Sequence, residues 1–249
     1  MAVHDFRSQR LFIENDLREG VPVDASREQA NYLLNVLRLT NGSQILVFNG
    51  RDGEWLVDIQ VLGRKKCSIV PVKQIRSQPD PPSLVYCFAP LKQARLDYMV
   101  QKAVEMGVGT LQPIITQHTQ VRTVNTKRMK SNAIEAAEQC GVLSIPEVRE
   151  PVGLSAFLTE VEESTQLVFC DEASPRADIQ SELQELKGGE LMLLIGPEGG
   201  FSDDERSLIM ENRRTYKLGL GPRILRADTA AVAALTILQA LAGDWYNEA

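Results

Sequence analysis

A strand, a glycine-rich turn and a helix start follow one another at residues 191–202, which read LMLLIGPEGGFS. The apolar run Leu191–Ile195 has the length of a buried strand, and Ser202 with Glu205 has the spacing of a capping box that opens a helix. Glycines between them let the backbone approach a ligand closely. Open α/β sheets bind ligands in a crevice at the carboxyl ends of their strands. This stretch therefore predicts an α/β domain with a ligand site in the turn, and a tight turn without a ligand is the alternative.

The same alternation of strand and helix patterns extends over residues 84–249. Apolar runs typical of buried strands lie at residues 84–89, 111–115, 167–170, 191–195 and 216–220. Helical patterns lie at residues 94–105, 127–139, 179–186, 203–211 and 229–241. Such alternation favours a parallel sheet covered by helices on both faces.

A proline-rich linker, residues 77–83, precedes this domain. It carries Pro79, Pro81 and Pro82, and prolines defeat both helices and central strands. Before it, Trp55, Val57, Ile59 and Val61 recur at every second position, as in a half-buried strand, and residues 45–48 and 67–72 are further short apolar runs. One helix is expected at residues 26–37, with Ser26 as its N-cap. The segment 1–76 is therefore predicted to be a small β-barrel with one helix.

A second glycine-bearing loop, residues 218–230, reads LGLGPRILRADTA. Asp228 or Thr229 is expected to cap the helix that follows, and Arg226 stands just before it, in a position to meet an anion or a polar base edge. The pair Gly219 and Gly221 lacks the third glycine of a dinucleotide-binding fingerprint, and the chain has no Gly-Lys-Ser/Thr segment for a P-loop.

Composition excludes several classes of protein. The chain is 43% hydrophobic and 24% charged, with no apolar run of membrane-spanning length and a polar start that carries no signal-peptide core. The four cysteines are scattered and the chain has only two histidines, so neither a metal site nor a disulfide framework is expected. These features predict a cytoplasmic protein with reduced cysteines.

The net charge of −6 conceals basic clusters. Residues 1–78 hold 11 Lys/Arg and 9 Asp/Glu, a net of +2, whereas residues 79–249 hold 16 and 24, a net of −8. Phosphate binding depends on local positive potential, so an acidic protein can still bind RNA. Solvated faces with no partner are the alternative. The candidate phosphate contacts are Arg7, Arg10, Arg38, Arg64, Lys65, Lys66, Arg122, Lys127 and Arg128.

The segment 196–201 and the elements Leu218-Gly219, Arg223-Ile224-Leu225-Arg226 and Thr229-Ala230 together resemble the RsmE-type 16S ribosomal RNA (uridine-N3) methyltransferases of the SPOUT superfamily. Weaker matches at residues 10–12, 36–38, 92, 102–108 and 135–139 extend the resemblance, in order, over almost the whole chain. The resemblance implies a PUA-like RNA-binding β-barrel at residues 1–76 and a SPOUT methyltransferase domain with a deep trefoil knot at residues 84–249. It further implies S-adenosylmethionine (SAM) as cofactor, a homodimer, and methylation of a uridine in the 16S ribosomal RNA of the small subunit.

The chemistry of the reaction that the resemblance implies suggests roles for residues. Uridine N3 carries a proton at neutral pH, so the enzyme needs a base, a cation that stabilises the deprotonated ring, or both. Arg226 is the candidate for charge stabilisation, Glu198 and Asp228 are candidates for a base or for orienting Arg226, and His118 is a weaker candidate. Either carboxylate could instead cap a helix. The expected cofactor-binding residues are Ile195, Gly196, Pro197, Glu198, Gly199, Gly200, Leu218, Gly219, Ile224 and Leu225.

Three other functions compete with this one. A non-catalytic RNA-binding or ribosome-assembly protein would have no need of the two intact glycine loops or of Arg226. A SPOUT enzyme for another RNA, such as transfer RNA, differs only in its target. A nucleotide-dependent oxidoreductase would carry glycines in its first strand-to-helix turn, where this chain has none at residues 90–94.

Overall fold

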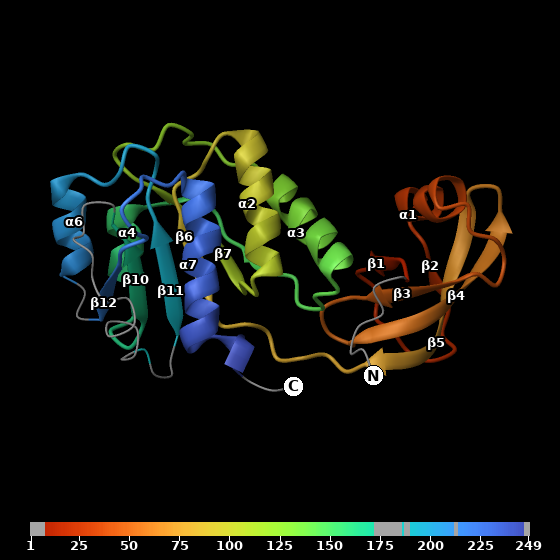
Figure 1. Ribbon diagram of the computed structural model, residues 1–249. Coiled ribbons are helices and arrows are strands. Elements are labelled where there is room, and N and C mark those ends of the chain that lie inside the picture. Colours follow the sequence, from red (N-terminus) through yellow and green to blue (C-terminus); the bar gives the residue numbers. More distant parts are fainter. Residues whose placement is uncertain (1–7, 172–185, 187–189, 212–213, 247–249) are drawn as a thin grey trace. The chain divides into compact units, whose positions relative to one another are not determined.

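The computed structural model describes residues 8–171, 186, 190–211 and 214–246 (Figure 1). The chain divides into two compact units. One comprises residues 1–80 with 137–145, and the other comprises residues 81–136 with 146–249. The helical pattern expected at residues 179–186 lies almost entirely outside the described residues.

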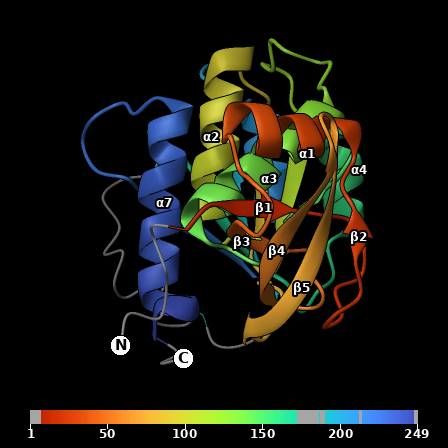
Figure 2. The same cartoon turned by 90° about the vertical axis from the view of Figure 1, so that its right-hand side faces the viewer.

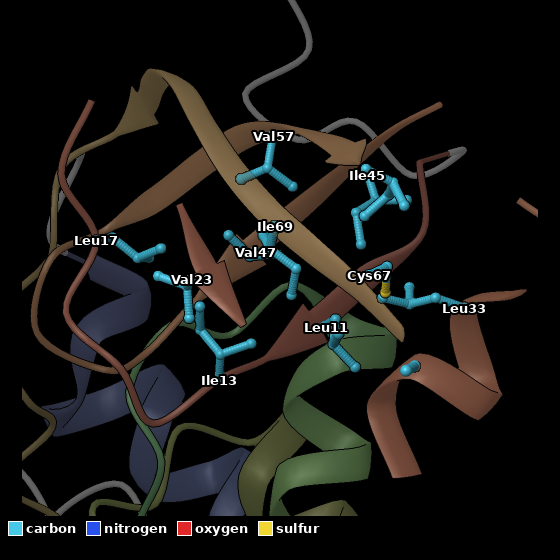
Figure 3. Packing of buried hydrophobic residues seen from close by; sticks show 12 residues of the cluster. Leu11, Ile13, Leu17, Val23, Leu33, Ile45, Val47, Val57, Cys67 and Ile69 are labelled. Carbon is cyan, nitrogen blue, oxygen red and sulfur yellow. The ribbon is translucent and has the colours of Figure 1, made fainter. Parts of the chain in front are cut away.

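The first unit is built on a five-stranded sheet in the order β1-β3-β4-β5-β2. β1 pairs with β3 in parallel, and the other neighbours are antiparallel. Its apolar core includes Leu11, Ile13, Val47, Val57 and Ile69, which point toward one another in Figure 3. The strands are β1 (Arg10–Phe12), β2 (Val23–Asp24), β3 (Gln44–Phe48), β4 (Glu54–Gly63) and β5 (Lys66–Arg76).

The helix expected at residues 26–37 begins as predicted and then changes pitch. Ser26 is the N-cap of α1 (Arg27–Asn31), and its hydroxyl and the Gln29 side chain form a reciprocal capping box. The chain continues as a π-helical turn, η1 (Tyr32–Val36). It leaves this turn through Arg38, whose φ of 55° lies in the left-handed region that non-glycine residues seldom adopt.

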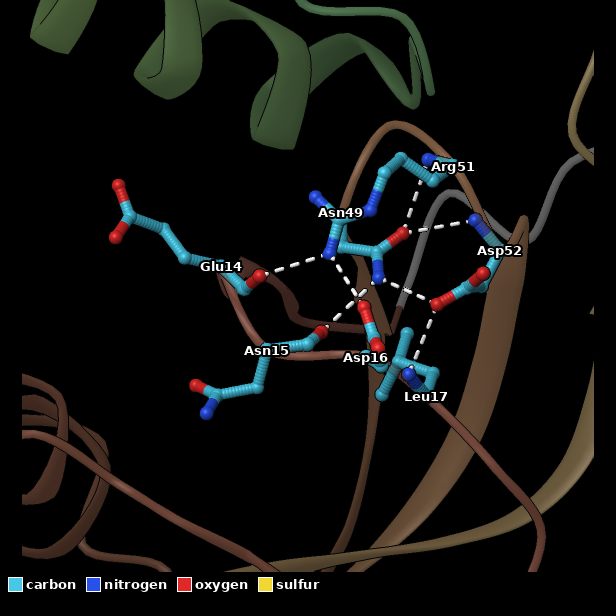
Figure 4. Close-up of polar contacts among 7 residues, drawn as sticks. All are labelled: Glu14, Asn15, Asp16, Leu17, Asn49, Arg51 and Asp52. Atoms are coloured by element: carbon cyan, nitrogen blue, oxygen red, sulfur yellow. Dashed lines mark hydrogen bonds and ion pairs between the residues drawn. The ribbon is translucent and has the colours of Figure 1, made fainter.

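A polar cluster ties the 14–17 segment to the turn after β3 (Figure 4). Asn49 Nδ2 donates to Asp52 Oδ2 at 2.7 Å and to the Asn15 carbonyl at 3.0 Å, and the Leu17 amide donates to the same Asp52 oxygen at 2.9 Å. These donors stabilise the carboxylate, the Leu17 amide most, and lower the pKa of Asp52. Hydrogen bonds therefore hold the turn after β3 against the segment that follows β1.

A buried ion triad crosses the same unit. Arg10 Nε lies 2.8 Å from Glu54 Oε1, and Arg76 Nε lies 2.7 Å from Glu54 Oε2. Arg76 Nη2 also donates to the Gly141 carbonyl at 2.9 Å. Because the Arg10 and Glu54 side chains are only 4% and 2% exposed, their attraction offsets part of the cost of burying both charges.

The second unit contains the predicted parallel sheet, which the described strands confirm. Its order is β12-β10-β11-β6-β7-β8, with β9 pairing to β7, and each of these pairings is parallel. The strand predicted at residues 216–220 instead ends at Leu218, two residues earlier. The strands are β6 (Val85–Phe88), β7 (Thr110–Ile115), β8 (Glu147–Val148), β9 (Val152–Gly153), β10 (Gln166–Cys170), β11 (Leu191–Ile195) and β12 (Thr215–Leu218).

Helices cover both faces of this sheet, as the sequence predicted (Figures 1 and 2). On one face, Phe157 of α4 and Ile209 of α6 pack with Val85 and Cys87. On the other face, the Tyr86 hydroxyl reaches Met99 of α2, and α2 lies against α7. The helices are α2 (Gln93–Glu105), α3 (Thr126–Cys140), α4 (Leu154–Glu160), α6 (Asp203–Met210) and α7 (Ala227–Ala242), followed by the short η2 (Asp244–Tyr246).

Among the described residues, no helix combines the length and the apolar character needed to cross a bilayer. Nor do the described ranges hold a group of three or more His, Cys, Asp or Glu side chains placed to bind a metal ion.

Candidate functional site

A pocket of about 330 Å³ lies at the carboxyl ends of β10, β11 and β12. These three strands are neighbours in the sheet, so the loops that leave them converge at one edge. The lining consists of Cys170, Asp171, residues 195–199, residues 218–225, Ala227 and Ala230. This is the crevice in which open α/β sheets hold ligands.

The expected cofactor-binding residues gather in this pocket with one exception. Ile195, Gly196, Pro197, Glu198, Gly199, Leu218, Gly219, Ile224 and Leu225 all line it. Gly200 is not among the lining residues. Its amide donates to the Pro197 carbonyl at 2.9 Å, and its φ of 68° is left-handed, so Gly200 closes the turn rather than facing the pocket. We call residues 196–200 the glycine turn.

Gly196 is required by close packing. A Cβ at this position would lie 2.5 Å from Cε2 of Phe201, well inside carbon–carbon contact distance. The Phe201 ring is 4% exposed and packs edge-on against Phe169 with ring centroids 5.0 Å apart. The ring therefore anchors the glycine turn to the core, and only glycine leaves room for it.

Asp171 and Cys170, at the end of β10, are pocket residues that the sequence reading missed. Asp171 is 7% exposed, and Arg206 Nε of α6 lies 3.2 Å from its Oδ1. Burial raises the pKa of the Cys170 thiol to about 12, so it stays protonated at neutral pH. The signal was present in the sequence, because Asp171 directly follows an apolar run whose neighbours in the sheet carry the glycine loops.

The three candidate catalytic residues have different surroundings. Glu198 is a lining residue of the pocket, and its carboxylate forms an ion pair with Arg95 of α2, a partner that the sequence reading did not identify. Among the described residues the lining includes neither Arg226 nor Asp228, although Leu225 and Ala227 on either side of Arg226 belong to it.

The predicted cap of α7 at Asp228 or Thr229 is wrong. The helix begins earlier, at Ala227, and Arg226 is its N-cap residue without a side-chain cap bond. Asp228 stands in the first turn, where its Oδ1 accepts from the Thr229 amide at 3.0 Å. A carboxylate in this place interacts favourably with the helix dipole. Arg226 is exposed, at the rim where the second glycine loop meets α7.

His118 lies against the glycine turn. Its Nδ1 is 3.1 Å from the Gly199 carbonyl oxygen and 3.0 Å from that of Gly200. The Gln117 amide donates to Glu205 Oε1 at 2.7 Å, and Glu205 Oε2 accepts from the Ser202 amide at 2.9 Å within the predicted capping box, which is confirmed. The segment after β7 therefore forms hydrogen bonds both to the glycine turn and to the first turn of α6.

The candidate phosphate contacts of the first unit are exposed, with one correction. Arg10 was predicted to contact a phosphate, but its side chain is buried in the ion triad with Glu54, so its guanidinium is not exposed to a phosphate. Lys66 lies 3.8 Å from Asp24, an exposed pair worth little. Arg7 lies outside the described residues. The exposed members are Arg38, Arg64, Lys65 and Lys66.

In the second unit, Arg122, Lys127 and Arg128 are exposed, but Arg128 already has a partner. Its Nη2 and Nε lie 2.7 and 3.2 Å from the two carboxylate oxygens of Asp97, which also accepts from Asn132 and Gln93. These bonds, chiefly the one from Arg128, lower the pKa of Asp97. Arg128 therefore fastens α3 to α2 and has fewer donors left for RNA.

Comparison with known proteins gives a consistent result over most of the chain. An RNA methyltransferase domain matches residues 78–239, and an RNA methyltransferase PUA domain matches residues 26–72. Ribosomal RNA small subunit methyltransferase E of Rickettsia conorii is 30% identical over 93% of this chain and 95% of its own length.

Two solved structures share the fold over almost their full lengths. The methyltransferase Lpg2936 of Legionella pneumophila, in complex with SAM, is 31% identical, with a TM-score of 0.80 over 94% of this chain and 98% of its own. Ribosomal RNA small subunit methyltransferase E of Neisseria gonorrhoeae, bound to S-adenosyl methionine, is 26% identical. Its TM-score is 0.85 over 96% of this chain and 100% of its own.

Proposed function

Because the chain belongs to the RNA methyltransferase family that includes ribosomal RNA small subunit methyltransferase E, we propose that it transfers a methyl group from SAM to N3 of a uridine in 16S ribosomal RNA. The observation that carries this proposal is the pocket at the carboxyl edge of the parallel sheet, formed by two glycine-bearing loops. A protein that only bound RNA would have no use for such a pocket.

The lining residues fit SAM in their chemistry. Adenine is generally held by main-chain donors and acceptors between apolar walls, and Ile195, Leu218 and Leu225 with their loop backbones supply both. The cofactor carries a sulfonium and an ammonium group, and two acidic residues, Asp171 and Glu198, are among the residues that line the pocket. Arg223, also in the lining, offers a charge for the cofactor carboxylate. SAM, when bound, supplies an electrophilic methyl group.

The chain's own residues must then make uridine N3 a nucleophile. We assign Arg226 the main role, because a guanidinium stays charged and can donate to two acceptors at once, here the uracil oxygens that gain charge when N3 loses its proton. Asp228, two residues further on in the first turn of α7, orients Arg226 or accepts the proton. Glu198 is assigned to the cofactor side, since its carboxylate is already paired with Arg95.

RNA binding is assigned to both units. The PUA-like domain, which we place at residues 1–76, binds phosphates through Arg38, Arg64, Lys65 and Lys66, and Arg7 belongs to the same set. Arg122 and Lys127 provide a second group of contacts in the methyltransferase domain, residues 84–249, beyond the linker 77–83. Phosphate contacts of this kind set position and affinity rather than sequence choice. A uridine must leave its base stack to reach the methyl group.

We further propose that the enzyme acts as a homodimer in the cytoplasm and that its glycine loops form a deep trefoil knot. Exposed apolar side chains support the dimer: Ile224 is 97% exposed, and Tyr98, Leu241 and Trp245 are also exposed, on α2, α7 and η2. Since α2 and α7 pack together, Tyr98 and Leu241 lie on neighbouring helices. Large apolar side chains left exposed on neighbouring elements are what an interface between subunits would cover.

The test is transfer of a radiolabelled methyl group from SAM to small ribosomal subunits that lack this modification. We expect label in 16S ribosomal RNA with the wild-type protein. If the protein binds SAM but labels transfer RNA instead, the SPOUT enzyme with another target is correct. If it does not bind SAM, the non-catalytic RNA-binding function is correct.

A further inference from the structure

Two side chains from other elements hold the glycine turn from outside its own segment. His118, in the turn after β7, contacts the carbonyls of Gly199 and Gly200. Arg95, near the start of α2, pairs with the Glu198 side chain. Neither residue lines the pocket among the described residues, yet both contact residues that form one wall of it.

The hydrogen-bonding chemistry of His118 is fixed by its partners. Carbonyl oxygens only accept, so Nδ1 must carry a proton to bond to Gly199 and Gly200. Both the neutral Nδ1–H tautomer and the charged imidazolium meet this requirement. The imidazole therefore holds the turn in either ionisation state, by donation from Nδ1.

The turn that presents His118 is itself well braced. The Thr116 amide donates to Thr119 Oγ1 at 2.9 Å, the two threonine hydroxyls lie 2.8 Å apart, and both threonines are buried. The hydrogen bond from the Gln117 amide to the Glu205 carboxylate connects the same turn to α6. The backbone that carries His118 is therefore held in place by hydrogen bonds on both sides of the residue.

The two residues that His118 contacts, Gly199 and Gly200, are among those with the greatest backbone freedom in the turn. Glycine loses more conformational freedom on ordering than any other residue, and Gly199 and Gly200 are consecutive. His118 lies close over Gly199, where a Cβ would be 3.3 Å from the His118 Cβ and 3.7 Å from Cγ of its ring. Ordering a binding loop before the ligand arrives reduces the entropy lost on binding and raises affinity.

We propose that His118 and Arg95 are positioning residues that pre-order the glycine turn for the cofactor, His118 through its Nδ1 proton and Arg95 through Glu198. This rests on the proposed function, because it takes SAM as the ligand of the pocket. It assigns His118 no proton-transfer role, and its ring Nε2 is not required.

The test compares three His118 variants by calorimetric titration with S-adenosylhomocysteine. Asparagine places its Nδ2 donor at the same position along the side chain as histidine Nδ1, whereas glutamine resembles Nε2 and alanine has neither group. We expect H118A and H118Q to weaken binding by roughly three- to tenfold, the effect of one or two lost hydrogen bonds. H118N should stay within about twofold of the wild type, because it keeps the donor.

Arg95 is tested with a matched control on the same unit. We expect Arg95→Met to weaken binding by roughly two- to fivefold, in keeping with a partly exposed ion pair. Arg149→Met removes another exposed arginine–glutamate pair, that of Arg149 with Glu147 at 3.1 Å, which has no contact with the pocket. It should leave affinity unchanged. Thermal unfolding of each variant reports whether it is folded.

Other outcomes overturn the proposal. If all His118 variants and Arg95→Met bind like the wild type, the turn does not depend on either residue. If H118Q binds and methylates normally while H118N does not, Nε2 is the nitrogen that matters, and positioning through Nδ1 is wrong. Failure of the proposed function looks different, because the wild type itself would then not bind S-adenosylhomocysteine.

Discussion

Replacing Gly196 with alanine places a methyl group inside the space of the Phe201 ring. The added Cβ would lie 2.5 Å from Cε2, 2.9 Å from Cδ2 and 3.0 Å from Cζ. Carbon atoms in contact are normally about 3.5–4.0 Å apart, so the ring or the turn must move by roughly 1 Å. The ring is buried against Phe169 and cannot swing into solvent. Overpacking of this kind costs about 1–3 kcal/mol.

The cost should appear in both stability and cofactor affinity. Moving the ring displaces the glycine turn, because Phe201 directly follows Gly200, and the pocket wall formed by Ile195 and Pro197 moves with it. We expect Gly196→Ala to lower the free energy of unfolding in urea by about 1–3 kcal/mol. We also expect it to weaken S-adenosylhomocysteine binding by roughly tenfold or more, since one ångström of misplacement separates polar groups beyond hydrogen-bond distance.

Gly153→Ala is the control. Gly153 belongs to the same unit, and a Cβ there would meet nothing within 4 Å. We expect a change of less than about 1 kcal/mol in stability, because only the N-cap preference of α4 changes, and unaltered binding. If Gly196→Ala matched Gly153→Ala in both measurements, the account of the turn as closely packed against Phe201 would be refuted.

Two of the remaining predictions concern buried or partly buried ion pairs, and the third concerns the role proposed for Arg226. Glu54→Ala removes the carboxylate shared by Arg10 and Arg76 and leaves the Arg10 charge buried without it. We expect this change to lower the free energy of unfolding in urea by about 3–5 kcal/mol. A loss below about 1 kcal/mol would contradict the triad. Arg226→Ala should keep S-adenosylhomocysteine affinity within about threefold but reduce methyl transfer by roughly a hundredfold or more; normal transfer would exclude Arg226 as the charge-stabilising group. Asp97 has a lowered pKa in the folded state, so its contribution to stability is present above its ordinary value near 3.8 and is lost as pH falls toward the lowered value. Asp97→Asn should therefore destabilise the protein at pH 6 and make unfolding less sensitive to acid between pH 5 and 2; an unchanged pH profile would contradict the pairing with Arg128.

The parts of the fold that could be predicted are those whose cause lies in neighbouring residues. Leu191–Ile195 is a continuous apolar run because its strand is covered on both faces, and the capping box of Ser202 with Glu205 fixes where α6 begins. The strand predicted to reach residue 220 ends at Leu218, because Gly219 and Leu220 turn into the pocket. Elements as short as β8 and β9 are set by pairing to β7 and have no pattern of their own.

The site residues that could be predicted are likewise those that lie close together in the sequence. Residues within the two glycine loops could be named because the loops are continuous in sequence, and they line one pocket. Arg95 is 103 residues from Glu198, and His118 is 81 from Gly199, so these partners are set by the order of strands in the sheet. The burial of Arg10 could not be predicted for a similar reason, since the Glu54 carboxylate with which it pairs is 44 residues away in the sequence. A charged residue in a sequence does not show where its counter-charge lies.

The most direct test of the central claim is the identity of the methylated nucleoside. Small ribosomal subunits without the modification would be incubated with SAM and either the wild-type protein or Arg226→Ala, and their 16S ribosomal RNA digested to nucleosides for mass spectrometry. We predict 3-methyluridine with the wild-type protein and little or none with the variant. A different methylated nucleoside, or equal 3-methyluridine from both proteins, would contradict the account.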